Sequence, residues 1–486
     1  MNRFIGIDLG TSSVKLMLVD SLGNIIKVTS RDYQVYYPQP NYSEQDPSDW
    51  YNSAIDGLKE LIADTDKTLI KGISFAGQMH GLVILDENDE VIRRCILWND
   101  GRTEKQVEYL NNVIGKEKLS QLTGNIAFAG FTAPKILWVK ENEPENFSKI
   151  KKIMLPKDYL AYKFSGVYAS DYSDASGTLY LDVKNKCYSK EMCEILGITN
   201  IELPKLFESY ESIGNITESL VNELGLNKDC KVIIGAGDNA AASIGTGNIT
   251  EGMANVSIGT SGTIFIPLDN FVVDDNNSLH SFCHSNGKYH LMGCILSAAS
   301  CRNWWLEGIL NTSDFAQDEQ DIKNANNTDL IFLPYLTGER SPHNDVFAKG
   351  AFVNLTINTT KGDMSKAILE GVSFALRDSL EVAKKCGIKF DQVTLCGGGA
   401  RSNSFIQIIA DVFNMPISLL ENEQGPSFGA SILAMVGTKE YNSVKDACDK
   451  LVKIKRTVYP NKDNVLFYED KYQKFRKLYP LLKEIR

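Results

Sequence analysis

The sequence predicts an α/β protein made of two similar halves. Short strand-like runs alternate with amphipathic helical patterns along the 486 residues, and glycine-rich turns open several of the helices. The turn Gly10-Thr11-Ser12 lies between two strand-like runs, and Gly259-Thr260-Ser261 repeats this arrangement about half the chain later. Self-similarity of this kind indicates an internal repeat, with the boundary near residue 245. A chance match of three small residues is the alternative.

The first thirty residues predict an antiparallel meander. The runs "FIGIDLG", "VKLMLVD" and "IIKVTS" alternate like strands and are separated by "TSS" and by the turn-forming "SLGN". The stretch "DPSDWYNSAIDGLKELIAD" predicts a helix that Asp46 caps and that carries Pro47 at its first position. The strand "GISFAG" follows, so the half consists of a meander followed by helix and strand units.

The second half continues with the same kinds of pattern. We expect a helix in "SAASCRNWWLEGIL", a strand in "DLIFLPYL" and a long helix in "DMSKAILEGVSFALRDSLEVAKKCG". Strand, glycine turn and helix follow one another in "VTLCGGGARSNSFIQIIADVF", and a similar turn opens a helix at "GPSFGASILAMVG". A basic C-terminal helix is expected from about Tyr472, where the charges indicate a solvated face.

Composition excludes several classes of function. The net charge is −10 and there is no long basic run, so neither a nucleic acid nor an anionic membrane surface is expected as a partner. Apolar runs are far shorter than the roughly 18 residues of a membrane span, and the strand pattern that begins at Phe4 leaves no room for a signal peptide. Ten cysteines without a CxxC pair predict reduced thiols and a cytoplasmic protein.

The two Gly-Thr-Ser turns indicate phosphate binding. Successive backbone N–H groups in a tight turn form a positive concavity that suits an anion, and the threonine and serine hydroxyls add donors. Both turns could hold one polyphosphate if the two halves face each other. Asp8, beside Gly10, could then hold Mg²⁺ through water, although an aspartate that caps the turn would look the same.

The segment "CGGGARSN" differs from a dinucleotide-binding fingerprint, because Ser402 stands where GxGxxG requires its last glycine. As a glycine turn that opens a helix, it could still accept the adenosine and α-phosphate of a nucleotide. A plain tight turn is the competing interpretation.

The segment "GAGDNAA" places Asp238 at the end of a strand among small residues that let other groups approach. Taken alone, Asp238 is more simply interpreted as a helix N-cap. Zinc binding by His280, Cys283 and His284 is not favoured, because no second cluster completes a four-ligand site. A serine or cysteine hydrolase is not favoured either, since the chain has only five histidines that could serve as the base.

Taken together and in this order, "GIDLGTSSVK", "GAGDNAA", "SIGTSGT", "CGGGARSN" and "GPSFGAS" resemble the FGGY family of carbohydrate kinases, essentially end to end. "SEQDPSDW", "GQMHG", "ILWNDGR", "GFTAPKILWV", "LPKDYL", "SDYSDASGT" and "FLPYLTGERSPHN" are similar to its xylulose kinase branch. The resemblance implies two ribonuclease-H-like domains of the actin and hexokinase ATPase fold, 1–245 and 246–486, with a cleft between them. It also implies transfer of the γ-phosphoryl group of MgATP to the 5-hydroxyl of D-xylulose.

The resemblance also implies roles for particular residues. Asp238 would be the general base that takes the proton from the sugar hydroxyl. Asp8 would be the candidate Mg²⁺ ligand, and a homodimer would be a possible assembly. The sugar side would be formed by Gln78, Met79, His80, Asn99, Arg102 and Asn239, and the ATP side by Thr11, Gly259, Thr260, Gly399 and Asn403.

Two alternatives stay open at this stage. A kinase of the same family for glycerol, ribulose, fuculose or gluconate would share the nucleotide machinery and differ only in the sugar motifs. An ATP-driven conformational protein of the actin or chaperone type would need the nucleotide turns but no catalytic aspartate facing a polyol.

Overall fold

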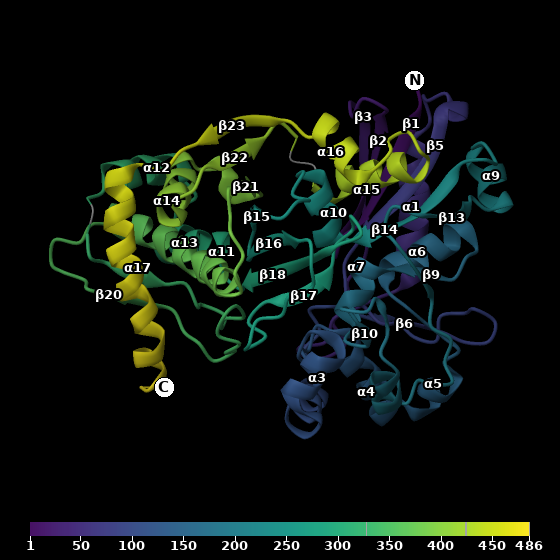
Figure 1. The fold of residues 1–486 in the computed structure, drawn as a ribbon, viewed down its shortest axis with the longest axis horizontal. Helices are drawn as coiled ribbons and strands as arrows, with labels where there is room; N and C mark the ends of the chain where they lie inside the picture. The colour runs from purple at the N-terminus through teal and green to yellow at the C-terminus, as the bar shows by residue number, and fades with distance from the viewer. Residues whose placement is uncertain (327, 423–424, 486) are drawn as a thin grey trace.

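The computed structural model describes residues 1–326, 328–422 and 425–485. Two large β-sheets lie in separate lobes, each with helices packed against it (Figure 1). The strands of the first sheet run in the order β13 (Ser212–Asn215), β14 (Lys231–Gly237), β5 (Ile70–Gly77), β1 (Arg3–Leu9), β2 (Ser13–Asp20) and β3 (Ile25–Asp32).

The first sheet confirms the predicted meander. β2 pairs antiparallel with both β1 and β3, while β5 lies parallel to β1 and β14 lies parallel to β5. The predicted helix is α1 (Pro47–Leu61), where the Asp46 carboxylate accepts a hydrogen bond from the Ser48 N–H at 2.9 Å. Its apolar stripe, which includes Trp50 and Leu58, is buried in the core of this lobe.

The second sheet repeats this arrangement. β15 (Met253–Ile258) and β16 (Gly262–Leu268) form an antiparallel hairpin around the second Gly-Thr-Ser turn. β21 (Gln392–Cys396) lies parallel to β15 just as β5 lies parallel to β1. The internal repeat predicted from the sequence is therefore present in the structure. The strand order is β17 (His280–Cys283), β18 (Tyr289–Ile295), β16 (Gly262–Leu268), β15 (Met253–Ile258), β21 (Gln392–Cys396), β22 (Ile417–Leu420) and β23 (Ile454–Val458).

Helices cover both sheets, and small elements extend the first lobe. The main helices besides α1 are α6 (Pro156–Ser165), α9 (Glu218–Leu224), α10 (Asp238–Gly245), α12 (Phe315–Asn324), α13 (Lys361–Lys385), α14 (Asn403–Phe413), α15 (Gly425–Gly437), α16 (Val444–Leu451) and α17 (Lys462–Lys483). Smaller elements include β4 (Glu44–Gln45), β6 (Val83–Leu85), β7 (Cys95–Ile96), α2 (Glu104–Glu108), α3 (Lys116–Thr123), α4 (Thr132–Asn142), α5 (Pro144–Lys149), β8 (Lys152–Met154), β9 (Ala169–Asp171), α7 (Tyr172–Ala175), β10 (Leu181–Asp182), β11 (Cys187–Tyr188), α8 (Lys190–Leu196), β12 (Lys205–Phe207), α11 (Ala299–Asn303), β19 (Ile331–Leu333) and β20 (Ala351–Val353).

Two helices of the second half, α15 and α16, pack against the first lobe. α15 packs against α10, β1 and β5, and α16 packs against α15, as the yellow helices of Figure 1 show. Their apolar residues, among them Phe428 and Leu433, share one core with Phe4 of β1 and Ile244 of α10. The two sheets lie on either side of the predicted division at residues 245 and 246, which stays a prediction, but contacts between the halves extend through this core.

The C-terminal helix begins earlier than predicted. α17 starts at Lys462 rather than near Tyr472, because Asn461 caps it by accepting a hydrogen bond from the Asp463 N–H at 3.0 Å. Tyr468 and Tyr472 are buried against the second lobe, so the helix has an apolar face as well as its charged one.

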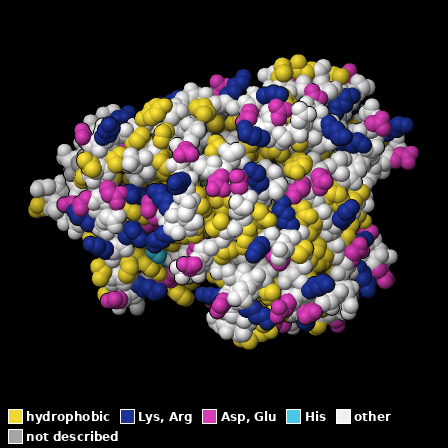
Figure 2. All heavy atoms as spheres, in the orientation of Figure 1, with side chains coloured by type: hydrophobic (Ala, Val, Ile, Leu, Met, Phe, Trp, Pro, Cys, Tyr) yellow, Lys and Arg dark blue, Asp and Glu magenta, His cyan; other side chains and the backbone are white. Residues whose placement is uncertain are grey.

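The distribution of charged side chains on the surface agrees with the absence of a long basic run in the sequence (Figure 2). Figure 2 shows acidic and basic side chains intermingled over the visible face. Within the residues that the structure describes, no helix combines the length and the apolar character that a membrane span requires.

Candidate active site

Asp238 lies where β14 ends and α10 begins, in the region where the two lobes meet (Figure 1). Its Oδ1 accepts hydrogen bonds from the backbone N–H of Asn239 at 2.7 Å and from the Asn239 side chain at 2.9 Å. Asp238 is the first residue of the helix, and the N-cap position belongs to Gly237. The N-cap interpretation of Asp238 is therefore wrong, and its carboxylate is available for another role.

Asp8 occupies the corresponding end of β1. Leu9 stands opposite Gly77 of β5, and Gly77 stands opposite Gly237, so the ends of β1 and β14 flank the end of β5. Burial and the nearby negative charge of Asp238 raise the pKa of Asp8 to about 7, while Lys15 opposes the shift. Burial also raises the pKa of Asp238 to about 6, against the stabilising hydrogen bonds from Asn239.

A cavity of about 260 Å³ opens beside Asp238, and both halves of the chain line it. Asp238 and Asn239 come from the first half, whereas Asn255, Thr263 and Cys396 come from strands of the second sheet. The cavity therefore lies between the two sheets, and polar side chains face it from both.

A larger cavity of about 650 Å³ adjoins the first one. Gly397 lines the smaller cavity and the next residue, Gly398, lines the larger one, so the two meet at the glycine turn. The larger cavity brings together the predicted nucleotide-side residues of the second half, Gly259, Thr260, Gly399 and Asn403.

The first Gly-Thr-Ser turn is held by neighbouring side chains. The Trp98 indole N–H donates to the Thr11 hydroxyl at 2.9 Å, and Gln45 Nε2 donates to the Thr11 carbonyl at 2.6 Å. The Trp98 side chain is 44% exposed, so it is not a core residue. The turn thus has a fixed shape beside Asp8, as an anion-binding turn requires.

The predicted sugar motif reaches the same region. Met79 is 4% exposed and lies against the residue before Asp238, since a Cβ added to Gly237 would stand 2.9 Å from Met79 Cγ. Gln78 Nε2 donates to Gln45 Oε1 at 2.9 Å, and Gln45 in turn contacts Thr11. The motif is therefore connected by hydrogen bonds to the first phosphate turn.

His80 has one fixed tautomer. Its Nδ1 lies 2.8 Å from the Gly177 carbonyl, which only accepts hydrogen bonds, so Nδ1 carries the proton and Nε2 is an acceptor. The ring stacks on Phe131 with the ring centroids 4.8 Å apart. Burial, together with the positive charge of Lys135, lowers the pKa of His80 to about 3, so the ring is neutral at pH 7.

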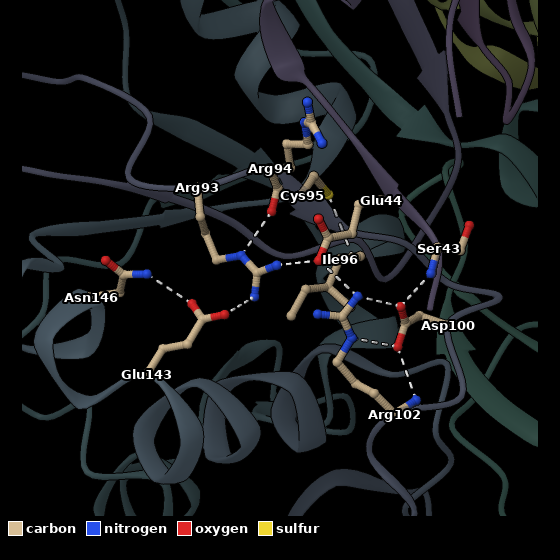
Figure 3. A network of polar contacts seen from close by, with 10 residues as sticks. All are labelled: Ser43, Glu44, Arg93, Arg94, Cys95, Ile96, Asp100, Arg102, Glu143 and Asn146. Atoms are coloured by element: carbon tan, nitrogen blue, oxygen red, sulfur yellow. Dashed lines mark hydrogen bonds and ion pairs between the residues drawn. The ribbon is translucent and has the colours of Figure 1, made fainter. Parts of the chain in front are cut away.

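Arg102 lies inside an ion-pair network, shown in Figure 3. Its guanidinium contacts Asp100 at 2.7 Å and Glu44 at 2.8 Å, and its side chain is 1% exposed. Asp100 also accepts a hydrogen bond from the Ser43 N–H at 2.5 Å, so the network fixes the loop that carries Asn99. Asn99 is exposed on that loop, whereas Nε and Nη2 of Arg102 already have acceptors.

Sequence reasoning assigned no role to several residues of the site. Arg302, Phe315 and Glu319 line the larger cavity from the segments that contain α11 and α12. Asn255, Thr263 and Cys396 line the smaller one. The glycine turns drew attention to the neighbourhood of these residues, but only the packing of distant segments shows which side chains reach the cavities.

Comparison with known proteins agrees with this geometry. The N-terminal domain model of the FGGY family of carbohydrate kinases matches residues 3–245, and the C-terminal domain model of the same family matches residues 254–438. The xylulose kinase of Staphylococcus epidermidis is 38% identical over 99% of this chain and 97% of its own length.

Solved structures show the same fold over the whole chain. A structure described as a xyloylose kinase from Brucella ovis is 36% identical, with a TM-score of 0.95 and full coverage of both chains. A gluconate kinase from Lactobacillus acidophilus is 28% identical, with a TM-score of 0.95, and covers 99% of this chain and 98% of its own. The α/β architecture predicted from the sequence is thereby confirmed as the actin and hexokinase type of fold. The chain belongs to the FGGY family of carbohydrate kinases.

Proposed function

We propose that this protein phosphorylates D-xylulose at its 5-hydroxyl, using ATP and releasing D-xylulose 5-phosphate and ADP. The observation that carries the proposal is the pair of adjoining cavities: the smaller contains Asp238, and the larger contains the predicted nucleotide-side residues. A nucleotide in the larger cavity would extend its phosphates past the glycine turn toward Asp238. The similarity to xylulose kinases over nearly the whole chain supports the choice of sugar.

Asp238 is the proposed general base. With a pKa of about 6 its carboxylate is charged at neutral pH and basic enough to take a proton from a hydroxyl group. As that proton moves to Asp238, the sugar oxygen forms a bond to the γ-phosphorus and the bond from phosphorus to the leaving oxygen of ADP breaks. Burial of the carboxylate on α10 excludes water that would otherwise compete with the sugar.

The sugar would lie beside Met79 and His80. The unprotonated Nε2 of His80 can accept a hydrogen bond from a sugar hydroxyl, and the amide of Asn239 can both donate and accept. Asn99 is exposed on its loop and can reach a ligand, whereas Nε and Nη2 of Arg102 are paired with Asp100 and Glu44. We therefore propose Arg102 as a positioning residue for that loop, and Gln78 as the link to the phosphate turn.

The nucleotide would lie across the glycine turn. Thr260 and Thr11 would offer backbone N–H groups and hydroxyls from the two hairpin turns. The Gly259 N–H already donates to the Ser261 carbonyl at 3.0 Å, so Gly259 would contribute close backbone approach instead of a donor. Gly399 lies in the turn before α14 and Asn403 is the first residue of α14, where a helix N-terminus and an amide suit the adenosine side. The two halves, 1–245 and 246–486, would thus each contribute one phosphate turn.

The carboxylates also fit a magnesium ion. Asp8 and Asp238 are two nearby acids whose pKa values are both raised, and hard oxygen donors of this kind suit Mg²⁺. Asp8 would hold the ion, through water or directly. When bound, Mg²⁺ supplies positive charge that offsets the negative charge on the transferred phosphoryl group.

The proposal is tested by identifying the product. Purified protein is incubated with ATP, Mg²⁺ and D-xylulose, and phosphorus NMR locates the new phosphate ester. The proposal expects a sugar monophosphate whose phosphorus couples to the protons on C5, formed in equal amount to ADP. ADP formed without any sugar phosphate would indicate an ATPase of the conformational type and would overturn the proposal.

A further inference from the structure

A buried ion cluster lies beneath the end of β14, outside the residues that the proposed reaction uses. Lys157 Nζ, on α6, lies 2.6 Å from Asp158 Oδ1, 3.0 Å from Asp171 Oδ1 and 3.9 Å from Asp174 Oδ2. All four side chains are 0% exposed. Burying charges at such depth costs stability unless they are paired, so a cluster of this kind calls for an explanation other than stability alone.

Charge balance shows that the cluster supplies its own cation. Three carboxylates surround one ammonium group, which lies within 4 Å of an oxygen of each. Burial and the neighbouring carboxylates, including Asp238, raise the pKa of Asp174 well above its usual range, while Lys157 opposes the shift. Lys157 therefore offsets part of the negative charge of the three carboxylates.

β14 is irregular at this point. Its pairing with β5 changes register between Ile233 and Ala236, which marks a bulge at residues 234 and 235. Gly235 has φ +79°, and a Cβ there would stand 1.9 Å from the Phe75 carbonyl oxygen, so only glycine fits. Bulges beside active sites redirect the residues that follow them, and here those residues lead directly to Asp238.

Lys157 of the cluster and the neighbouring Ser209 form hydrogen bonds with the backbone of this bulge. Lys157 Nζ donates to the Ile234 carbonyl at 3.5 Å, and the Gly235 N–H donates to the Ser209 carbonyl at 3.1 Å. Ser209 is also tied to the cluster, because its hydroxyl donates to Asp171 Oδ2 at 2.6 Å. The bulge therefore has its shape fixed by groups from α6 and from the segment before β13.

The cluster also reaches the residue immediately before Asp238. Asp171 Oδ2 accepts hydrogen bonds from the Ser173 N–H at 2.9 Å and from the Ser173 hydroxyl at 2.5 Å. The Ser173 oxygen in turn accepts a hydrogen bond from the Gly237 N–H at 3.2 Å. A continuous path of contacts thus runs from Lys157 through Asp171 and Ser173 to the backbone N–H of Gly237, the residue before Asp238.

We infer that Lys157, Asp171 and Ser173 are positioning residues that fix the carboxylate of Asp238 at the reacting hydroxyl. The kinetic part of this inference rests on the proposed function. Productive geometry tolerates displacements of only about 0.5 Å, so loosening the Gly237 peptide should reduce the rate of the chemical step more than the binding of the sugar.

Two buried serines provide a matched test. Ser173 and Ser209 both donate to the same Asp171 oxygen, but only the Ser173 hydroxyl contacts Gly237. Ser173→Ala should lower kcat about tenfold or more and leave the KM for the sugar within about twofold. Ser209→Ala should lose similar stability but leave kcat within about twofold, because its contact with Gly235 uses the backbone carbonyl.

The outcomes separate this inference from the proposed function. Equal kcat values for the two variants, with wild-type protein active, would overturn the inference and leave the kinase assignment intact. Wild-type protein inactive on every sugar would contradict the proposed function. The structural part is then decided without substrate: amide hydrogen exchange in residues 232–240 should be faster in Ser173→Ala than in Ser209→Ala, and equal exchange would overturn it.

Discussion

Asp8 and Asp238 stand on either side of the end of β5, close enough for the charge of Asp238 to raise the pKa of Asp8. Two acids held together in a partly buried cleft repel each other when both are ionised, which costs stability in the free protein. A bound Mg²⁺ and a sugar hydroxyl would each relieve that repulsion. The arrangement is therefore one that ligands stabilise, as expected of an active site.

Asp238→Asn should keep the fold and lower kcat by about 10² to 10⁴, because the amide cannot take the hydroxyl proton. Steady-state ADP release, with KM values for both substrates, measures the effect. Asp46→Asn, at the N-cap of α1, is the control and should leave kcat unchanged. A near-normal kcat for Asp238→Asn would refute the general-base assignment.

His80→Ala should raise the KM for the sugar about tenfold and change the KM for ATP by less than about twofold, since it removes one hydrogen-bond partner of the sugar. The same assay, with each substrate varied in turn, gives both constants. Equal changes in the two KM values would show that His80 is a structural residue.

Asn403→Ala should have the opposite effect and raise the KM for ATP more than the KM for the sugar. Asn403 lines the larger cavity and opens α14, far along the chain from the sugar motif. Together with His80→Ala it forms a reciprocal pair. An Asn403 variant with an unchanged KM for ATP would place the nucleotide elsewhere.

Arg102→Ala should lower the free energy of unfolding by about 3 to 5 kcal/mol, because it leaves the buried Asp100 carboxylate without its cation, while Glu44 keeps its ion pair with Arg93. Chemical denaturation measures the change. Arg94→Ala is a suitable control: Arg94 is exposed and stacks on Tyr36, so its loss should cost at most about 1 kcal/mol. Equal losses for the two variants would contradict the buried network.

His290→Phe should make the protein less sensitive to acid. His290 stacks on Phe265 with the ring centroids 3.9 Å apart, and burial, helped by the nearby His284, lowers its pKa well below the usual range. The unfolded chain gains a proton at His290 below about pH 6.5 while the folded chain does not, so this residue destabilises the fold as pH falls.

The expected difference is measurable in urea titrations. Below about pH 6, the stability of His290→Phe relative to wild type should rise by about 1.4 kcal/mol for each unit of pH. At about pH 7.5 the relative stability should be independent of pH. A difference in the free energy of unfolding between the two proteins that stays constant down to about pH 5.5 would show that His290 is protonated in the folded state.

Local sequence rules predict much of this fold. The Asp46 cap with Pro47 correctly locates α1, and the two Gly-Thr-Ser turns correctly locate both hairpins and the internal repeat. These features depend on residues close together in the chain. The predicted start of α17 is too late, because that prediction depends on the basic charges after Tyr472 and leaves out the Asn461 cap and the apolar face that carries Tyr468.

The rest of the site depends on contacts between distant segments. The motif predicts Arg102 as a sugar-side residue. Its partner Glu44 lies in β4, far away in the sequence, so the pair is recognised only in the folded chain. Lys157 belongs to the motif "LPKDYL", in which the sequence assigns it no role. No local pattern shows that Asp171 and the bulge in β14 contact this lysine. Sequence patterns identify the chemistry here, and packing decides which side chains perform it.

The most direct test of the central claim is the sugar dependence of ADP release by wild-type protein. With MgATP held constant, kcat/KM is measured for D-xylulose, L-ribulose, D-ribulose, glycerol and gluconate. We expect D-xylulose to exceed every other sugar by about tenfold or more, the selectivity that one or two well-placed hydrogen bonds provide. ADP release at the same rate with every sugar and with none would contradict the account.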